Sequence, residues 1–429
     1  MAARAAGRMR HLAYALGVAL LVTTSVAVGV AAVDITPPAA GLSKAALKVP
    51  KKTLMGPGPS NAHPRVLQAA GLPLLGHLHP EFVKIMDEIK DWLKYAFQTS
   101  NTRTFPISGT GHAGMESAVA NFVEAGDKVL VGMNGIWGER MKILVERYGG
   151  VVVPLPKPHG EAFTLAEVGA ALGANPGIAI VFLTHGESST GVLQPIDGMG
   201  ALVHAHDALF FLDTVCTLGC VPFRVDADGV DITYSGSQKC LGAPPGTSPL
   251  SVSDRALAKY AARKAPPSTY YFDLSLLSDY WIGIGGDASK RFYHHTGPIS
   301  SMYALREALT ILGEEGLDRA WQRHAANAAR LWAGLDALGL ELFVKDPAHR
   351  LPTVTTIVVP DGVQWKDVTD FLMQKYRLEI SGGLGPTAGK VWRVGLMGYN
   401  STPEKVDALL RALKDGLDHV GWKGAKEEL

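Results

Sequence analysis

Apolar runs of strand length alternate with helix-patterned segments through most of the chain. Four runs are apolar at nearly every position, at residues 128–133, 178–184, 209–213 and 232–235. The segments between them repeat apolar residues every three to four positions, as one face of a helix does. This alternation predicts an α/β fold with a mainly parallel central sheet, because parallel strands need crossover helices. Ligands of such sheets bind beyond the carboxyl ends of the strands.

The pattern changes after about residue 299. A long helical stretch follows to about residue 340, and we expect Gly313 and Gly316 to break it. Strands at 353–359, 378–380 and 391–394, with helices at 366–374 and 403–417, then predict a smaller C-terminal α+β domain. We therefore expect a large domain at 54–312 and a small domain at 313–429.

The first 33 residues have the composition of a targeting or anchor segment. They contain no acidic residue, and Arg4, Arg8 and Arg10 precede an uncharged apolar run at 12–33. The basic start favours a mitochondrial presequence and so the mitochondrial matrix. The apolar run is also long enough for a secretory signal or an anchor in the ER membrane. We expect an exposed arm at 34–53, and membrane contact only if residues 12–33 are retained.

Composition and the last residues of the chain limit the kinds of partner that we expect. The 41 basic and 40 acidic side chains leave a net charge of +1, so no basic field attracts nucleic acid. The three cysteines, Cys216, Cys220 and Cys240, lack the spacing of a zinc site, and we expect buried free thiols and no metal. The last four residues, 426–429, approximate an ER-retention signal, which we interpret as a chance match.

A glycine-rich turn at residues 108–114 follows an apolar strand and opens a helix. Its G-x-G-x-x-G spacing is also that of a dinucleotide-binding loop, but the next strand ends in Asn134 without the acidic residue that a ribose requires. Free backbone N–H groups and the helix dipole instead suit a single phosphate. A purely structural tight turn is the alternative.

Asp213 and Lys239 are the candidate chemical groups. Asp213 ends an apolar strand, where a carboxylate is often only a helix cap. Lys239 follows 26 residues later, after a short strand, among small residues and before a Gly/Pro-rich loop. A solvated lysine on a turn is the alternative, but small neighbours suit a lysine that a bulky ring must reach.

Together, the phosphate turn, Asp213 and Lys239 predict a site for pyridoxal phosphate (PLP). Lys239 would hold the cofactor covalently as a Schiff base, and Asp213 would keep the pyridine nitrogen protonated, since a buried carboxylate raises the pKa of a neighbouring base.

The residues resemble the class V, fold-type I PLP aminotransferases, and within them the alanine:glyoxylate (serine:pyruvate) aminotransferases. The resemblance covers nearly everything after the first fifty residues. Besides Asp213, it rests on LMGPGPSN at 54–61, SGTGH at 108–112, NGIWG at 134–138, THGESSTG at 184–191, SGSQKCLGAPPG at 235–246, YHHT at 293–296, GGLGP at 382–386 and WRVG at 392–395.

The resemblance implies roles for further residues. Trp137 would stack on the pyridine ring, although without the resemblance it reads as a core aromatic, and Ser188 would bond the ring's phenolic oxygen. The phosphate would be held by Thr110, Gly111, His112 and Gln238 of one subunit, with Tyr293 and Thr296 reaching it from the other subunit of a homodimer with shared active sites.

Substrate contacts follow in the same way. Arg393 lies in a strand-like segment, where an unpaired charge needs an anion. A structural salt bridge is one alternative, and the resemblance implies that its guanidinium binds the substrate α-carboxylate as a fork. Gly58 would allow substrate to approach closely.

The resemblance implies an enzyme that moves the amino group of L-alanine or L-serine to glyoxylate or pyruvate, so small amino acids and 2-oxo acids are the expected partners. By the same resemblance, a peroxisomal location is an alternative to the mitochondrial one. Residues 112–116 and 270–274 are also similar to insect 3-hydroxykynurenine transaminases, which leaves kynurenine transamination as an alternative activity. A cysteine desulfurase is disfavoured because no cysteine follows Cys240, and an idle binding module because Lys239 and Asp213 are both retained.

Overall fold

The computed structural model describes residues 45–424. The proposed targeting segment at 1–33, residues 34–44 of the proposed arm and the last four residues lie outside this range. The chain divides into a first unit, Met1–Pro50, and a second unit, Lys51–Leu429. Residues 45–50 of the first are exposed and form no helix or strand. Within 45–424, no helix is both long and apolar enough to span a membrane.

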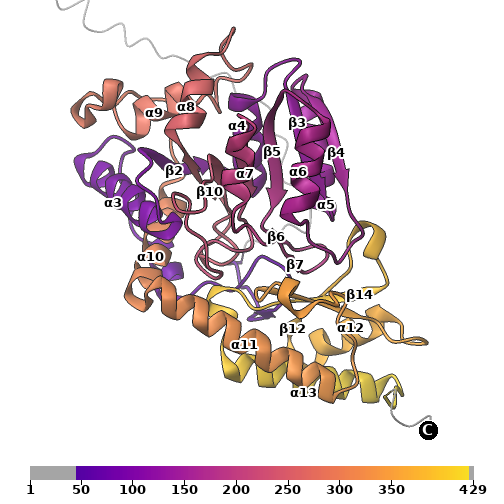
Figure 1. Ribbon diagram of the computed structural model, residues 1–429. Coiled ribbons are helices and arrows are strands. Elements are labelled where there is room, and N and C mark those ends of the chain that lie inside the picture. Colours follow the sequence, from indigo (N-terminus) through magenta and orange to yellow (C-terminus); the bar gives the residue numbers. More distant parts are fainter. Residues whose placement is uncertain (1–44, 425–429) are drawn as a thin grey trace, which may run out of the picture. The chain divides into compact units, whose positions relative to one another are not determined.

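A seven-stranded sheet forms the centre of the second unit (Figure 1). Its strands, in spatial order, are β2 (Arg103–Ser108), β10 (Thr247–Val252), β9 (Ile232–Tyr234), β8 (Leu209–Asp213), β5 (Ile178–Thr184), β3 (Lys128–Met133) and β4 (Val151–Pro156). Only β10 runs antiparallel to its neighbours. The predicted mainly parallel α/β sheet is therefore confirmed, and three of the four predicted strands have the expected bounds.

Helices cover this sheet and enclose the largest hydrophobic core of the described residues (Figure 1). They are α3 (Pro80–Phe97), α4 (Gly111–Phe122), α5 (Ile136–Arg147), α6 (Leu165–Ala174), α7 (Met199–Ala205), α8 (Asp254–Ala261), α9 (Leu274–Trp281) and α10 (Ile299–Glu315). Helix α2 (Pro64–Ala70) packs on α10. Because the core strands are buried on both faces, they read as continuous apolar runs rather than alternating ones.

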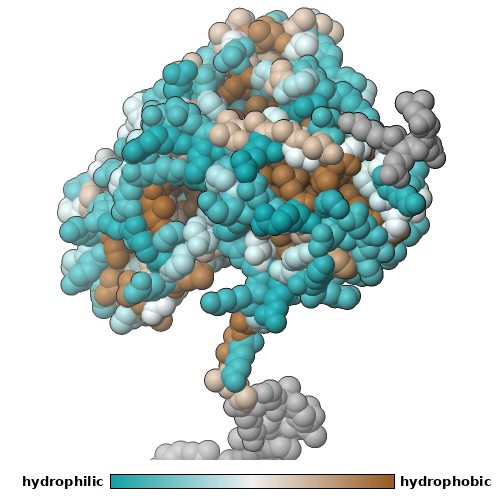
Figure 2. Space-filling model, turned by 90° about the horizontal axis from the view of Figure 1, so that it is seen from below, coloured by the Kyte–Doolittle hydropathy of each residue, from teal (hydrophilic) through white to brown (hydrophobic). Residues whose placement is uncertain are grey.

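The second core lies in the C-terminal part of the chain. Strands β11 (Val354–Val358), β14 (Val391–Gly395) and β13 (Ser381–Gly382) form an antiparallel sheet, and helices α11 (Leu317–Ala337), α12 (Trp365–Tyr376) and α13 (Pro403–His419) pack beside it (Figure 1). A view from below shows hydrophobic residues mainly in recesses of a largely hydrophilic face (Figure 2).

Two details differ from the expectations. Gly313 does not break the long helix but lies inside α10, where an added Cβ would overlap the ring of Trp92, so the glycine serves close packing. The break occurs at Gly316, which has φ of 85°. In addition, β1 (Thr53–Leu54) pairs with β12 (Leu378–Glu379), and Met55 belongs to the second core. The start of the expected large domain thus packs with the C-terminal part, while the boundary at residue 312 stays a prediction.

Gly138 on α5 is a point of close approach whose substitution we expect to destabilise the fold. A Cβ there would overlap the carbonyl oxygen of Gly132 on β3, and a backbone atom cannot rotate away. Gly138→Ala should lower the free energy of unfolding by ~1–3 kcal/mol, as overpacking does, measured as a lower urea midpoint. Gly173→Ala on α6 is the matched control: its Cβ meets nothing, so better helix propensity should stabilise the fold by up to about 1 kcal/mol. Equal effects of the two substitutions would contradict this account.

Candidate active site

The candidate site lies beyond the carboxyl ends of β5, β8 and β9. Register pairs Thr184 with Asp213 and Asp213 with Tyr234, so three strand ends meet at one edge of the sheet. Beside them is a cavity of about 570 Å³, which we call the active-site cavity. Its lining includes the predicted residues Thr110, Gly111, His112, Trp137, Asp213, Gln238 and Lys239.

Asp213 is a buried carboxylate held by two hydrogen bonds. The hydroxyl of Tyr234 donates to Oδ2 over 2.5 Å, and the N–H of Val215 donates to Oδ1 over 2.8 Å. Burial raises the pKa of Asp213 to about 6, while these two bonds and the charge of Lys239 act to lower it. The carboxylate is thus a poorly solvated anion with lone pairs left for a cationic partner in the cavity.

Lys239 lies in the turn that follows β9, and its side chain is half-buried. Its Nζ donates to the carbonyl oxygen of Pro57. The neighbouring Gly58 has φ of 123°, a conformation that favours glycine, and an added Cβ there would overlap Nζ of Lys239. Gly58 therefore leaves the space in which the lysine amine lies.

Gly111 and His112 begin helix α4 and present unpaired donors to the active-site cavity. Neither backbone N–H forms a hydrogen bond to any described residue, and the side chain of the N-cap residue Thr110 makes no cap bond. On the opposite wall, Oε1 of Gln238 is buried and has no partner in the described chain. Turning this amide over would place its NH₂ at the same point, which makes it a donor to an anion.

Trp137 and Ser188 are joined at one side of the cavity. The indole Nε1 of Trp137 donates to Oγ of Ser188 over 2.9 Å, and the ring lies edge-on to His112 at 5.4 Å. Below them, the fully buried Glu187 accepts from the N–H of Trp137 and from Ser189. Burial raises the pKa of Glu187 to about 7, although these hydrogen bonds act to lower it. The charge of Asp213 adds to the rise.

Arg393 lies in β14, 8% exposed, and does not line the active-site cavity. Its Nε donates to the carbonyl oxygen of Gly382 and Nη1 to that of Ser188, over 2.9 and 3.1 Å. Among residues 45–424 it has no ion pair, so the salt bridge considered as an alternative is not formed there. Burial lowers the pKa of this guanidinium despite the nearby Glu187. Because two bonds go to neutral carbonyls, the positive charge is left for an anion.

Tyr293 and Thr296 lie away from the active-site cavity of their own chain. Both are exposed, and their hydroxyl groups lie 3.3 Å apart. The ring of Tyr293 packs near His77 at 4.9 Å. Neither residue therefore lines the active-site cavity of its own chain.

A relay of histidines fixes the start of that turn. With both rings neutral, the carbonyl of Tyr270 accepts from Nε2 of His294, so Nδ1 of His294 accepts from Nδ1 of His295. Nε2 of His295 then accepts the hydroxyl proton of Ser108 over 2.7 Å. Burial lowers the pKa of His295 to about 4, which keeps this ring neutral.

The donor set fits PLP. The unpaired N–H groups of α4 and the amide of Gln238 suit its phosphate, Asp213 suits a protonated ring nitrogen, and the amine of Lys239 suits its carbonyl carbon. A buried amide atom without a partner costs ~1–3 kcal/mol, which a bound phosphate would offset.

The chain belongs to the class-V aminotransferases: the model of this family, aminotransferase class-V, matches residues 61–409. This chain is a PLP-dependent aminotransferase. The fold-type I architecture predicted from the sequence is confirmed.

Individual relatives are similar over nearly the whole chain. The alanine–glyoxylate aminotransferase of Callithrix jacchus is 50% identical over 91% of this chain and 92% of its own. The crystal structure of an alanine–glyoxylate aminotransferase from Nostoc sp. has a TM-score of 0.84 at 48% identity, covering 88% of this chain and 98% of that one. A ureidoglycine–glyoxylate aminotransferase structure from Bacillus subtilis also gives 0.84, at 36% identity and coverages of 89% and 97%.

Sequence reasoning assigned no role to Tyr234, Glu187 and His295. Tyr234 stands in the apolar strand β9 and gives no sign that it faces Asp213. Glu187 was visible in the 184–191 motif, and a lone acid in such a run of small polar residues was the available signal. His295 reads as an ordinary loop histidine until its contact with Ser108 is known.

Removing the Tyr234 hydroxyl should shift the pH dependence of the reaction. This hydroxyl stabilises the ionised form of Asp213, so Tyr234→Phe raises the pKa of the carboxyl further, and the ionised form then requires a higher pH. We expect the acidic limb of the kcat/KM profile to move up by about one pH unit, or ~1.4 kcal/mol.

Tyr95→Phe is the matched control for this measurement. The Tyr95 hydroxyl accepts from the N–H of Leu317, away from the active-site cavity. This variant should leave the acidic limb in place. An unshifted limb in Tyr234→Phe would disprove the proposed support of Asp213.

Proposed function

We propose that this enzyme transfers the amino group of L-alanine, or of L-serine, to glyoxylate or pyruvate, forming glycine and pyruvate in the main reaction. The observation that carries the proposal is identity of 46–50% to alanine–glyoxylate aminotransferases over about nine-tenths of the chain. The ureidoglycine–glyoxylate relative has a different amino donor in its name and the same acceptor. Glyoxylate is therefore better supported as acceptor than alanine as donor.

The residues that line or adjoin the active-site cavity account for proton transfer. When bound, PLP supplies an electron sink that acidifies the Cα–H bond of an amino acid. Lys239 is the base for this proton, because its amine is the flexible basic group that lines the active-site cavity, and Gly58 leaves it room. Asp213 holds the ring nitrogen in its protonated form, and Trp137, fixed by Ser188 and Glu187, orients the ring.

Arg393 would bind the substrate carboxylate. The substrate and the product of each half-reaction both carry a carboxylate beside the reacting carbon. A guanidinium fork whose charge has no acidic partner in the described chain suits this group. Arg393 donates to the carbonyl of Ser188, and the hydroxyl of Ser188 accepts from Trp137. Ser188 would therefore set the distance between the substrate carboxylate on Arg393 and the cofactor ring on Trp137.

A homodimer with shared sites is part of the proposal. Tyr293 and Thr296 are exposed and removed from their own cavity, as residues that serve a second subunit would be. Exposed apolar side chains that a partner subunit would cover are near them in the sequence or on α2 and the following loop: Leu67, Leu72, Leu74, Tyr270, Ile284 and Phe292.

For location, the proposal remains the mitochondrial matrix, on the basic and acid-free residues 1–33. A peroxisome, or the secretory pathway with a retained apolar run, is the alternative. An N-terminus of the native protein before about Leu12 would support an anchor, and one near Leu47 an imported enzyme.

The activity is tested by comparing amino donors with the purified enzyme. With glyoxylate as acceptor, kcat/KM for L-alanine should exceed that for 3-hydroxykynurenine by at least about tenfold, or ~1.4 kcal/mol in transition-state stabilisation. Lys239→Ala, the control for PLP-dependent turnover, should abolish both reactions. Faster turnover of 3-hydroxykynurenine would overturn the proposed donor in favour of the kynurenine alternative.

The role of Arg393 is tested by Arg393→Lys, which keeps the charge but loses the fork. We expect KM for alanine and for glyoxylate to rise by about 10- to 100-fold, the cost of one charged hydrogen-bonded contact, ~1.5–3 kcal/mol. PLP affinity should stay within about twofold, because Arg393 does not line the active-site cavity. Arg103→Lys is the matched control, because Arg103 lies on β2 and its side chain bonds to Thr102, away from the active-site cavity. Unchanged KM values would contradict the assignment.

A further inference from the structure

A second cavity, of about 660 Å³, lies on the other side of the Lys239 turn, and we call it the rear cavity. Cys220, Cys240, Leu241 and Gly242 line it, whereas Gln238 and Lys239 line the active-site cavity. The chain thus changes from one cavity to the other between Lys239 and Cys240. Cys240 directly follows the catalytic lysine, so a covalent modification of Cys240 would act on the backbone that positions Lys239.

All three cysteines of the chain come together here. They are buried and belong to one small hydrophobic cluster with Met397. Each of two thiols donates to a backbone carbonyl of another cysteine: Cys220 to that of Cys240 over 3.7 Å, and Cys240 to that of Cys216 over 3.1 Å. Cys220 and Cys240 line the rear cavity and Cys216 does not. Two of the three cysteines therefore border a cavity that is large enough for a small reagent.

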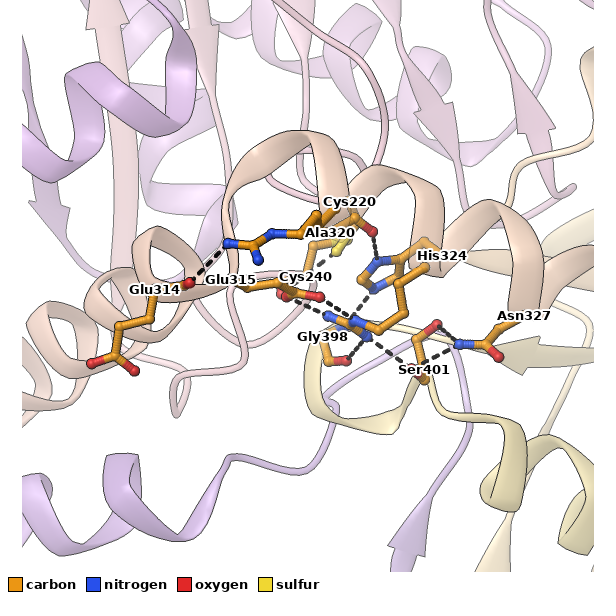
Figure 3. Close-up of polar contacts among 11 residues, drawn as sticks. Cys220, Cys240, Glu314, Glu315, Ala320, His324, Asn327, Gly398 and Ser401 are labelled. Atoms are coloured by element: carbon orange, nitrogen blue, oxygen red, sulfur yellow. Dashed lines mark hydrogen bonds and ion pairs between the residues drawn. The ribbon is translucent and has the colours of Figure 1, made fainter.

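A fixed polar frame surrounds the two thiols (Figure 3). His324 is fully buried, donates from Nδ1 to the carbonyl of Ala320 over 2.6 Å and accepts at Nε2 from the N–H of Gly398 over 3.0 Å. Arg323 pairs with both oxygens of Glu315 and also donates to the carbonyl of Gly398. These groups have their partners already, so the thiols are the reactive groups left in this wall.

The two thiols are unequal. Burial acts to raise the pKa of both, and the contact between the two side chains acts on the two values in opposite directions. The pKa of Cys220 lies below its usual value despite burial, because the side chains of Cys240 and His324 lie against it and favour its thiolate. The pKa of Cys240 lies well above its usual value. Cys220 is therefore the better nucleophile.

We propose that Cys220 and Cys240 form an oxidation site for small hydroperoxides that enter the rear cavity. The sulfur of Cys220 attacks the peroxide oxygen, the O–O bond breaks, and Cys220 becomes a sulfenic acid while hydrogen peroxide yields one water. The sulfur of Cys240 then attacks that of Cys220, the S–O bond breaks, and a second water leaves with the proton of Cys240. Two thiols are oxidised to one disulfide and one peroxide is reduced to two waters.

The disulfide would alter the Lys239 turn. Oxidation removes both S–H donors, and with them the bonds to the carbonyls of Cys240 and Cys216. It also links the residue after Lys239 to the turn that follows Asp213, where the N–H of Cys220 bonds to the carbonyl of Thr217. The turn that follows Asp213 and the turn that contains Lys239 would then be joined by one covalent bridge.

The test uses the PLP-loaded enzyme and hydrogen peroxide as the probe. After exposure, free thiols are alkylated and the digested protein is analysed by mass spectrometry without reduction. We expect a Cys220–Cys240 linked peptide, two hydrogens lighter than its parts, and an alkylated Cys216. The transaminase rate should fall by about tenfold, or ~1.4 kcal/mol in activation free energy, and dithiothreitol should restore it.

Cys216→Ser is the matched control and should still form the bridge, whereas Cys220→Ser and Cys240→Ser should not. Oxidation of one cysteine to sulfinic acid without a bridge, a bridge to Cys216, or no reaction would each overturn the proposal. The peptide map of the unsubstituted enzyme decides the matter alone if a variant does not fold. A bridge would stand as a finding even if alanine and glyoxylate proved not to be the substrates.

Discussion

The buried carboxylate of Asp213 is the constraint on which the site depends. Removing an anion from water is costly unless bonds and charges replace its hydration. Tyr234 and Val215 replace part of it, and the pKa of about 6 shows that the replacement is incomplete. A protonated pyridine nitrogen would complete it, so the protein without PLP holds a carboxylate whose surroundings suit a cation. The meeting of β8 and β9 at their carboxyl ends is what allows this arrangement.

One segment joins the two cores to this site. Residues 53–60 pair with β12 through β1, place Met55 in the second core and bring Gly58 against Lys239. Ser60 then bonds through its N–H to the carbonyl of Gln238 and through its hydroxyl to that of Met397. The turn of Lys239 is thus held between the central sheet and the C-terminal part of the second unit. The position of the lysine therefore depends on how these two parts pack.

Features that depend on neighbouring residues could be predicted from the sequence, whereas contacts between residues far apart along the chain could not. Strands β3, β5 and β8, the strand-end position of Asp213 and the position of Lys239 in the turn after a short strand follow from local patterns, and the structure brings both residues to one cavity. The partners of Asp213 and Ser108 depend on strand register and on loops 20 to 190 residues away, which periodicity does not encode. Gly313 was misread for the same reason, since its use is a contact with Trp92. Tyr293 and Thr296 have no role that a single chain can display.

The relay through His294 and His295 also settles how the phosphate turn can bind. With the hydroxyl proton of Ser108 directed at His295, this serine offers the turn no donor, and binding falls to backbone N–H groups and an uncharged amide. Such groups do not gain or lose protons between mildly acidic and mildly basic solution. The donors of this turn therefore keep their protons over that range, and any effect of acidity on the hold of the phosphate comes from the ring of His112 and from the second ionisation of the phosphate itself, at a pH of about 6.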